Sequence, residues 1–322
     1  MRDAHLLQHP VLRCLRRSLA ELRLGDGPLL LAVSGGRDST AMAGAMALLQ
    51  RRESVGLLRI AHVHHHQRLE SDDEAALVVS LGERLELPVE VLHLDVEVGA
   101  TPAVLRDARN TALAAEAKGC RADAVVMAHH ADDQLETILL AITRGAGPNG
   151  LAGMTDMRAF GDDARLARPL LQTTRAELTD LCEQLDLPWC DDPCNTNPDT
   201  LRGRLRRDVM GVLESFRPGV AGRAAAMAPV QAAAAGAFMA MLPVPVDDAW
   251  DRSRLARLPH AVRLAALHTE ASQCVAVDAL STATLSEAAD AIADAREHSR
   301  VFQVGGGLDI VIDATVVRLQ GV

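Results

Sequence analysis

Strand-like and helix-like patterns alternate through the first half of the chain, and this alternation limits the possible folds more than any other feature. The apolar runs typical of buried strands are residues 28–33, 57–63, 88–94 and 123–130, and the amphipathic stretches between them lie near 39–52, 71–86 and 102–118. Strands separated by helices predict an α/β fold, in which a parallel sheet has helices on both faces. Such sheets bind ligands at the carboxyl ends of their strands.

The rest of the chain changes in character after Pro218. Helical patterns cover 131–144, 174–186 and 202–213. An alanine-rich stretch then favours a connecting helix, and one more helical pattern precedes short strands around the glycine turn at 305–307. A length of 322 residues suits more than one core. We therefore predict a catalytic α/β domain over 1–222, a helical linker over 223–245, and a small α+β, substrate-binding domain over 246–322.

Composition excludes several classes of protein. The residues are 48% hydrophobic and contain no apolar run long enough to span a membrane, and the arginine-rich start predicts an amphipathic helix and not a signal peptide. Six scattered cysteines without a CxxC pattern predict reduced thiols and a cytoplasmic protein. The net charge of −10 does not by itself indicate a nucleic-acid binder, but the arginines of 202–207 form a local basic cluster suited to phosphate.

The strongest chemical motif is the hexapeptide Ser34–Ser39, which follows the first strand and precedes a helix. Its glycines allow close approach of a phosphate, and the helix start offers free N–H groups. Ser34 and Ser39 can donate hydroxyl hydrogen bonds, and Asp38 can hold a Mg²⁺ ion that bridges phosphate oxygens. The segment matches neither GxxxxGK[ST] nor GxGxxG. The alternative is an ordinary strand-to-helix turn.

A second cluster, residues 128–137, follows the fourth strand and reads AHHADDQLET. Two histidines and two acids in this order suggest a metal site. They equally suit a helix start, with Asp132 or Asp133 as the cap and Glu136 in the first turn. Both interpretations remain open on the residues alone.

These two motifs resemble those of known enzymes. The hexapeptide resembles the SGGxDS signature of the PP-loop, or N-type, ATP pyrophosphatases, which have a Rossmann-like fold and cleave ATP between its α and β phosphates. The string HHADDQLET closely resembles a motif of the tRNA(Ile)-lysidine synthase family. There it lines the pocket where ATP and the second substrate meet, which argues against a structural zinc site.

Further segments resemble the same family. Arg168–Leu171 and Asp192–Asn195, followed by Arg202–Arg206, are similar to the family's RPLL and DPTN…RNxIR segments, although Cys194 and Gly203 depart from them. Residues 62–71 resemble its second-strand segment. Three adjacent histidines there suggest metal binding, but alternate strand side chains point apart, so we expect satisfied histidines or an adenosine contact.

The resemblance implies a reaction and a set of site residues. With ATP and Mg²⁺, the enzyme would adenylate the wobble cytidine of tRNA(Ile) with a CAU anticodon and then join free lysine to its carbon 2, releasing AMP and pyrophosphate. A homodimer is left open. The implied catalytic residues are Asp38, Asp133, Arg109 and Arg202. The implied ATP contacts are Ser34, Gly35, Gly36, Arg37, Asp38, Ser39, His62 and His129. The implied contacts to the second substrate are Asp132, Asp133, Gln134, Glu136, Thr137, Arg106 and Arg206.

Three other functions use the same loop. A PP-loop tRNA thiolase would need catalytic cysteines, and Cys190 and Cys194 share one loop. A small-molecule amide ligase would keep the loop and change the substrate. A non-catalytic nucleotide-binding module is opposed by Asp38 and the intact HHADDQLET string.

Overall fold

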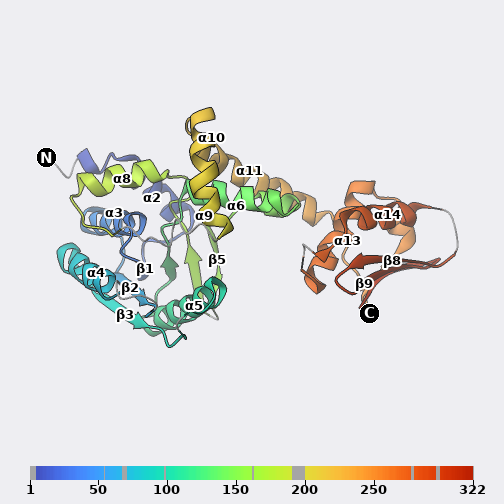
Figure 1. Cartoon of the computed structure of the whole chain (residues 1–322), viewed down its shortest axis with the longest axis horizontal. Helices are drawn as coiled ribbons and strands as arrows, with labels where there is room; N and C mark the ends of the chain where they lie inside the picture. The colour runs from blue at the N-terminus through green and yellow to red at the C-terminus, as the bar shows by residue number, and fades with distance from the viewer. Residues whose placement is uncertain are drawn as a thin grey trace. The chain divides into compact units, whose positions relative to one another are not determined.

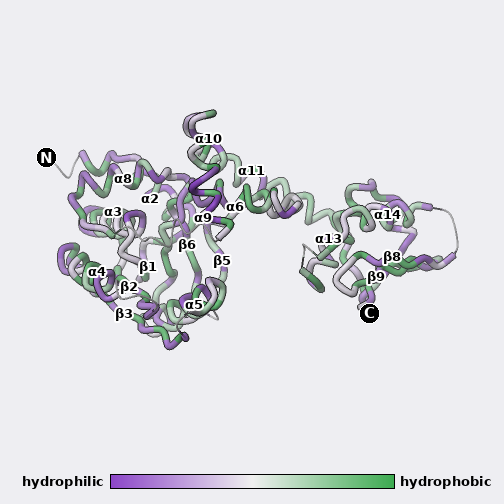
Figure 2. Tube along the Cα trace, viewed as in Figure 1, coloured by the Kyte–Doolittle hydropathy of each residue, from purple (hydrophilic) through white to green (hydrophobic). Residues whose placement is uncertain are grey.

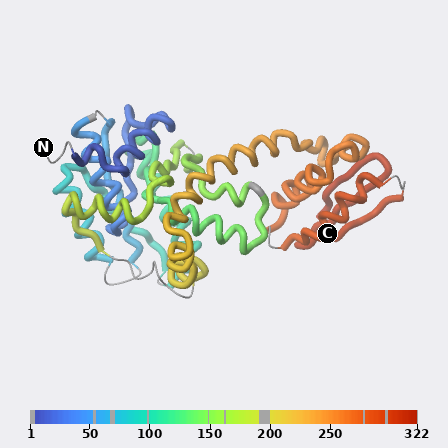
Figure 3. The backbone as a smooth tube through the Cα atoms, turned by 90° about the horizontal axis from the view of Figure 1, so that it is seen from above, coloured from blue at the N-terminus to red at the C-terminus, as the bar shows by residue number. Residues whose placement is uncertain are grey.

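The computed structural model describes residues 5–53, 55–66, 71–97, 99–161, 163–190, 200–276, 279–294 and 298–321. The chain divides into two compact units, one of residues 1–140 with 153–229 and one of residues 141–152 with 230–322. Two helices, α6 (Ala131–Thr143) and α11 (Val220–Ala240), have residues in both units (Figure 3). The boundaries expected from the sequence, with a linker over 223–245, remain a prediction.

The first unit is an α/β unit in which strands and helices alternate (Figure 1). Its elements before α6 are α2 (Pro10–Glu21), β1 (Leu29–Ala32), α3 (Arg37–Glu53), β2 (Leu58–His64), α4 (Ser71–Leu85), β3 (Val89–His93), α5 (Pro102–Gly119) and β4 (Ala124–Val126). After α6 come β5 (Met157–Phe160), β6 (Ala164–Ala167), α8 (Arg175–Gln184), α9 (Leu201–Leu205), a π-helical turn (Arg206–Met210), α10 (Gly211–Phe216) and α11.

The six strands form one sheet in the order β3-β2-β1-β4-β6-β5. All neighbours are parallel except β5, which runs antiparallel to β6. The predicted α/β class and its four strands are confirmed. The strands β5 and β6 were not predicted because each has only four residues and no clear alternation.

Side chains on β1 explain why both faces are covered. Leu29 and Leu31 are buried in the core that α2, α3, α4 and α8 build on one face, and Leu30 is buried in the core beneath α5 on the other. In Figure 1, α3 and α8 lie on one side of the sheet and α5 on the opposite side. The parallel strands β2, β1 and β4 lie side by side, so the loops that follow them meet at one edge of the sheet.

The second unit has its own core and a four-stranded antiparallel sheet, ordered β7-β10-β9-β8. Its elements are α7 (Pro148–Leu151), β7 (Ala249–Asp251), α12 (Arg252–Ala256), α13 (His260–Cys274), α14 (Thr282–Ala293), β8 (Arg300–Gly305), β9 (Leu308–Ile312) and β10 (Val316–Gly321). The predicted helix and strands around the glycine turn are confirmed. Buried Arg252 donates to the carbonyl oxygens of Ile292 and Asp313, which ties the end of α14 to the loop after β9.

Candidate active site

The loop Ser34–Ser39 connects β1 to α3 and is held by its own side chains. Ser39 Oγ donates to the Gly36 carbonyl at 2.9 Å and accepts from the Ser34 backbone N–H at 3.2 Å. Gly35 has φ of +86°, and a Cβ there would lie 3.2 Å from Cys190 Sγ. The Cys190 backbone N–H donates to the Gly35 carbonyl at 3.0 Å. A side chain at this position would be strained by the positive φ and would crowd the Cys190 sulfur. Glycine therefore suits the position and allows the loop to take this shape.

Arg37 opens α3, and its side chain turns away from this loop. Its Nη1 donates to Thr179 Oγ1 at 3.3 Å, and its guanidinium lies 5.2 Å from the centre of the Trp189 ring. Both partners lie in or after α8. If Arg37 contacts ATP as expected, the contact is made by its backbone N–H at the helix start and not by its side chain.

His130 joins the loop to the start of α6, and the sequence alone did not single it out. Its Nε2 lies 3.3 Å from Asp38 Oδ2 and 3.5 Å from Asp133 Oδ2, and its Nδ1 lies 3.5 Å from Asp132 Oδ2. Burial opposes the charged imidazole, but the carboxylates of Asp132, Asp133 and Asp38 outweigh it and raise the pKa of His130 to about 10. His130 is thus an imidazolium that holds three carboxylates together.

We expect His130→Gln to change how stability depends on pH. The folded pKa of about 10 lies above the unfolded value of about 6.5, so the contribution of His130 is complete below pH 6.5 and is lost as pH rises toward 10. The free energy of unfolding of the wild type should therefore fall relative to His130→Gln by up to about 1.4 kcal/mol per pH unit in this window.

Urea unfolding at pH 7, 8 and 9 measures this difference. Trp189 reports on the first unit, and a Trp250→Phe background removes the other tryptophan. Parallel pH profiles in the two variants would show that His130 is not an imidazolium in the folded protein. Every other group is common to both variants, so its contribution to the pH dependence cancels in the comparison.

His129 is neutral, unlike its neighbour. Burial is the largest effect and lowers its pKa to about 4; Asp133 opposes this, and the charges of Arg168, Arg109 and Arg202 add to the lowering. Arg168 Nε donates to His129 Nδ1 at 3.3 Å, so Nε2 carries the ring proton. Arg109 is half-buried in α5, and burial lowers its pKa, whereas Arg106 on the same helix is exposed.

Two arginines of the predicted basic cluster reach the start of α6. Arg206 Nη2 lies 2.8 Å from Asp133 Oδ1, and its Nε lies 2.5 Å from Glu136 Oε1. Arg202 Nη2 donates to Thr137 Oγ1 at 2.9 Å, and its Nε lies 3.1 Å from Glu136 Oε2. Figure 2 shows the hydrophilic colour of this segment around α9. The sequence placed these residues in separate motifs, and the fold brings them together.

Arg202 and Arg206 differ in how much of their side chains is exposed to solvent. The Arg202 side chain is 43% exposed, whereas that of Arg206 is 21% exposed and has two carboxylate partners. Burial first raises the pKa of Glu136, and the arginines only partly reverse this. Burial would also raise the pKa of Asp133, but His130 and then Arg206 bring it below its usual value. Arg202 therefore has an open side for a phosphate, and Arg206 positions the two carboxylates.

Two predicted site residues are occupied by structural contacts. Gln134 donates to the Met154 carbonyl at 3.0 Å and accepts from the Met154 N–H at 2.7 Å, which holds the chain after α7 against α6. His62 is buried in β2, and its Nδ1 lies 2.9 Å from the Val33 carbonyl oxygen, directly before the loop. Burial, only partly offset by this bond, lowers the pKa of His62, so the ring is neutral and supports the loop.

The residues around Asp38 fit a Mg²⁺ ion. Asp38 Oδ2 faces His130, but Oδ1 is buried and has no hydrogen-bond partner among the described residues. Magnesium takes one or two carboxylates together with substrate phosphates, and a free carboxylate oxygen beside a phosphate loop is such a ligand.

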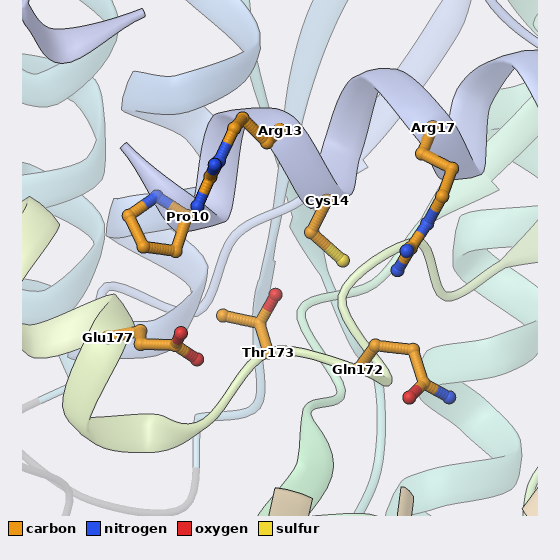
Figure 4. A pocket seen from close by; sticks show the side chains of 7 residues that line it. All are labelled: Pro10, Arg13, Cys14, Arg17, Gln172, Thr173 and Glu177. Carbon is orange, nitrogen blue, oxygen red and sulfur yellow. The ribbon is translucent and has the colours of Figure 1, made fainter. Parts of the chain in front are cut away.

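A separate pocket lies between α2 and the segment that leads into α8 (Figure 4). Its lining comprises Pro10, Arg13, Cys14, Arg17, Gln172, Thr173 and Glu177. None of the predicted site residues lines it, so it is distinct from the candidate active site. Gln67, Arg68 and Asp192–Asn195, which belong to segments that resemble those of the family, lie outside the described residues, and so does the Cys194 departure.

Comparison with known proteins identifies relatives of both units. A family model described as a PP-loop domain matches residues 8–213. A tRNA(Ile)-lysidine synthase from Salinispora arenicola is 36% identical over 321 residues, which cover 93% of this chain and 95% of that protein. One from Salinispora tropica is 42% identical over 62% of this chain, and the match spans 60% of that protein's length.

Other relatives are longer, and one solved structure supports the fold. The match to the tRNA(Ile)-lysidine synthase of Pseudomonas aeruginosa, at 38% identity, covers 65% of this chain and 47% of that protein. The U34-tRNA thiolase NcsA from Methanococcus maripaludis superposes with a TM-score of 0.57 at 18% identity, over 68% of this chain and 77% of that one. At this identity the likeness concerns the fold alone. Every helix of the described residues is too short or too polar to cross a membrane.

Proposed function

This chain belongs to the tRNA(Ile)-lysidine synthase family and carries its PP-loop domain, and we propose that it ligates lysine to carbon 2 of the wobble cytidine of tRNA(Ile) with a CAU anticodon. One observation carries the proposal beyond family membership. The ion contact between Asp38 and His130 joins the ATP loop to the acidic start of α6. Groups suited to ATP and groups suited to a cationic amine therefore share one edge of the sheet.

The first half-reaction uses the loop. The backbone N–H groups at the start of α3 and the Ser34 and Ser39 hydroxyls bind the phosphates of ATP. Asp38 would hold Mg²⁺, and the bound ion would supply positive charge for the departing pyrophosphate. The cytidine O2 attacks the α-phosphorus, the bond to the β-phosphate oxygen breaks, and Arg202 stabilises the charge on the α-phosphate.

The second half-reaction uses the carboxylates of α6. The ε-amine of lysine attacks carbon 2, the carbon–oxygen bond to AMP breaks, and the amine loses its proton. Asp132 and Asp133 attract the lysine ammonium, and Asp133 accepts the proton, with Arg206 and His130 fixing its two oxygens beforehand. Neutral His129, with its proton on Nε2, can donate to a ring or phosphate oxygen of the adenylate.

The remaining parts of the proposal concern partners and place. Arg109, Arg204 and the exposed Arg106 provide positive charge for the RNA backbone around the site. Free lysine is the amine, and the cytoplasm, where thiols stay reduced, is the compartment.

A tRNA thiolase is the second candidate because the Cys190 sulfur lies beside the loop, 3.2 Å from where a Cβ on Gly35 would stand. Lysidine chemistry needs no thiol, so we expect Cys190→Ser and Cys194→Ser each to lose less than about tenfold in kcat/KM, the range of a near-isosteric exchange. Thiolation would instead need a cysteine nucleophile, and a folded variant that lost several hundredfold would support the thiolase. Cys120→Ser, far along the chain in α5's cap, is the matched control.

Exchange of labelled pyrophosphate into ATP tests the proposed first half-reaction. The proposal predicts exchange that depends on the CAU transcript and proceeds without lysine, since the adenylate forms first. Exchange that depends on lysine and not on RNA would indicate a small-molecule ligase. A bound nucleotide with no exchange under any condition would indicate a non-catalytic module.

A further inference from the structure

Three histidines meet at the outer edge of the sheet, away from the residues that the mechanism uses. His64 ends β2, His66 follows two residues later, and His93 ends β3. One ring nitrogen from each lies within 4.8 Å of the others, and His66 Nε2 is 2.9 Å from His93 Nδ1. The His66 and His93 rings are stacked, with their centres 5.0 Å apart.

Strand pairing explains why these side chains converge. Parallel pairing of β2 with β3 places His64 opposite His93. The chain turns at His66, where φ is +52°, and this brings its ring to 4.0 Å from that of His64, measured between centres. The expectation that the histidines of this segment point apart was wrong for His64 and His66, which are two residues apart. No pattern in the sequence indicated that His93 joins them.

His64 has the surroundings of a metal ligand. It is buried, its Nε2 lies 2.9 Å from Asp72 Oδ1, and its Nδ1 is buried without a hydrogen-bond partner among the described residues. Metal-binding histidines commonly donate one ring N–H to a carboxylate, which fixes the tautomer that presents the other nitrogen to the metal. Asp72 thus leaves His64 Nδ1 as the nitrogen available for a metal.

We propose that His64, His66 and His93 bind a divalent transition metal, with Zn²⁺ as the ion to test. Three imidazoles suit zinc and its neighbours and not magnesium, which needs oxygen ligands. Zn–N bonds of about 2.0–2.1 Å in a tetrahedral site put the nitrogens roughly 3.3 Å apart, so small ring rotations suffice. His66 and His93 are exposed, which gives the ion a path from solvent and leaves a position for water. This site is separate from the proposed Mg²⁺ at Asp38.

Titration calorimetry of the full chain, prepared without a polyhistidine tag, tests the site with Zn²⁺ alone. The wild type should bind one Zn²⁺, and Asp72→Asn should weaken binding by about 10- to 100-fold, the usual effect of a supporting carboxylate. His66→Gln and His93→Gln remove ligands and should weaken it further. His268→Gln, a histidine of the second unit, is the matched control and should bind as the wild type does.

Two further measurements distinguish loss of this site from loss of folding, and histidine ligands from cysteine ligands. Co²⁺ bound to the wild type should give a tetrahedral visible spectrum without a thiolate charge-transfer band, and this spectrum should vanish in His93→Gln. Zn²⁺ should raise the Tm of the wild type and of His268→Gln, and not that of His66→Gln. Absence of binding by the wild type, or equal binding by the wild type and both ligand variants, would overturn the proposal.

Discussion

Asp38→Asn should lower the rate of tRNA-dependent AMP formation by on the order of 10³-fold, the effect of removing one preorganised charged group from an active site. Asp38 lies at the start of α3, where its Oδ2 meets His130 and its Oδ1 has no hydrogen-bond partner in the part of the chain that the structure describes. Asparagine keeps the shape and removes the charge, so the ion beside the phosphates is lost along with the partner of the imidazolium.

The control for this change is Asp208→Asn. Asp208 is an exposed acid of the same unit that pairs with exposed Arg207, so its loss should leave the rate unchanged. We expect Asp38→Asn to fold, because His130 keeps Asp132 and Asp133 as partners. Circular dichroism and the urea midpoint check this. Turnover of folded Asp38→Asn within a few-fold of the wild type would refute the assignment of the loop.

Arg202→Lys should cost about 2–4 kcal/mol of transition-state stabilisation, or roughly 30- to 900-fold in kcat/KM. The Arg202 guanidinium is anchored to Thr137 on one side and half-exposed on the other. Its planar fork can hold Thr137 and an α-phosphate oxygen together, and a lysine ammonium has no such fork.

Arg204→Lys provides the comparison. Arg204 lies two residues along the same helix and is exposed, so we expect a small effect in the same assay at fixed ionic strength, since phosphate contacts depend on salt. Equal and small effects of the two substitutions would mean that the cluster is a solvated helix face. In that case the α-phosphate contact would have to come from elsewhere.

Much of the fold was predictable because it depends on local patterns. The helices α3, α4 and α5 and the strands between them follow from apolar spacing, and the Ser34–Ser39 turn follows from its glycines. Strands β5 and β6 were not predicted because four residues are too few to show an alternating pattern. Even so, β6 is an interior strand of the sheet, between β4 and β5. The π-helical turn at Arg206 was also missed, since an ordinary helical pattern covers it.

The candidate site was only partly predictable because its chemistry depends on long-range contacts. Asp38 and Asp133 were found from their motifs, but the role of His130 depends on three carboxylates from two helix starts meeting around it. His129, next to it in sequence, is neutral because it is buried and accepts a hydrogen bond from Arg168, which outweighs the charge of Asp133. Gln134 matches a motif and yet holds a backbone segment, which sequence similarity does not distinguish from substrate binding.

Incorporation of labelled lysine into tRNA measures directly whether this chain attaches lysine to the wobble cytidine. The assay uses a tRNA(Ile) transcript with a CAU anticodon and a matched transcript in which only the wobble cytidine is replaced by uridine. We expect ATP-dependent incorporation into the first transcript, absence of incorporation into the second, and loss of incorporation in Asp38→Asn. Absence of label in the first transcript, or equal label in both, would contradict this expectation.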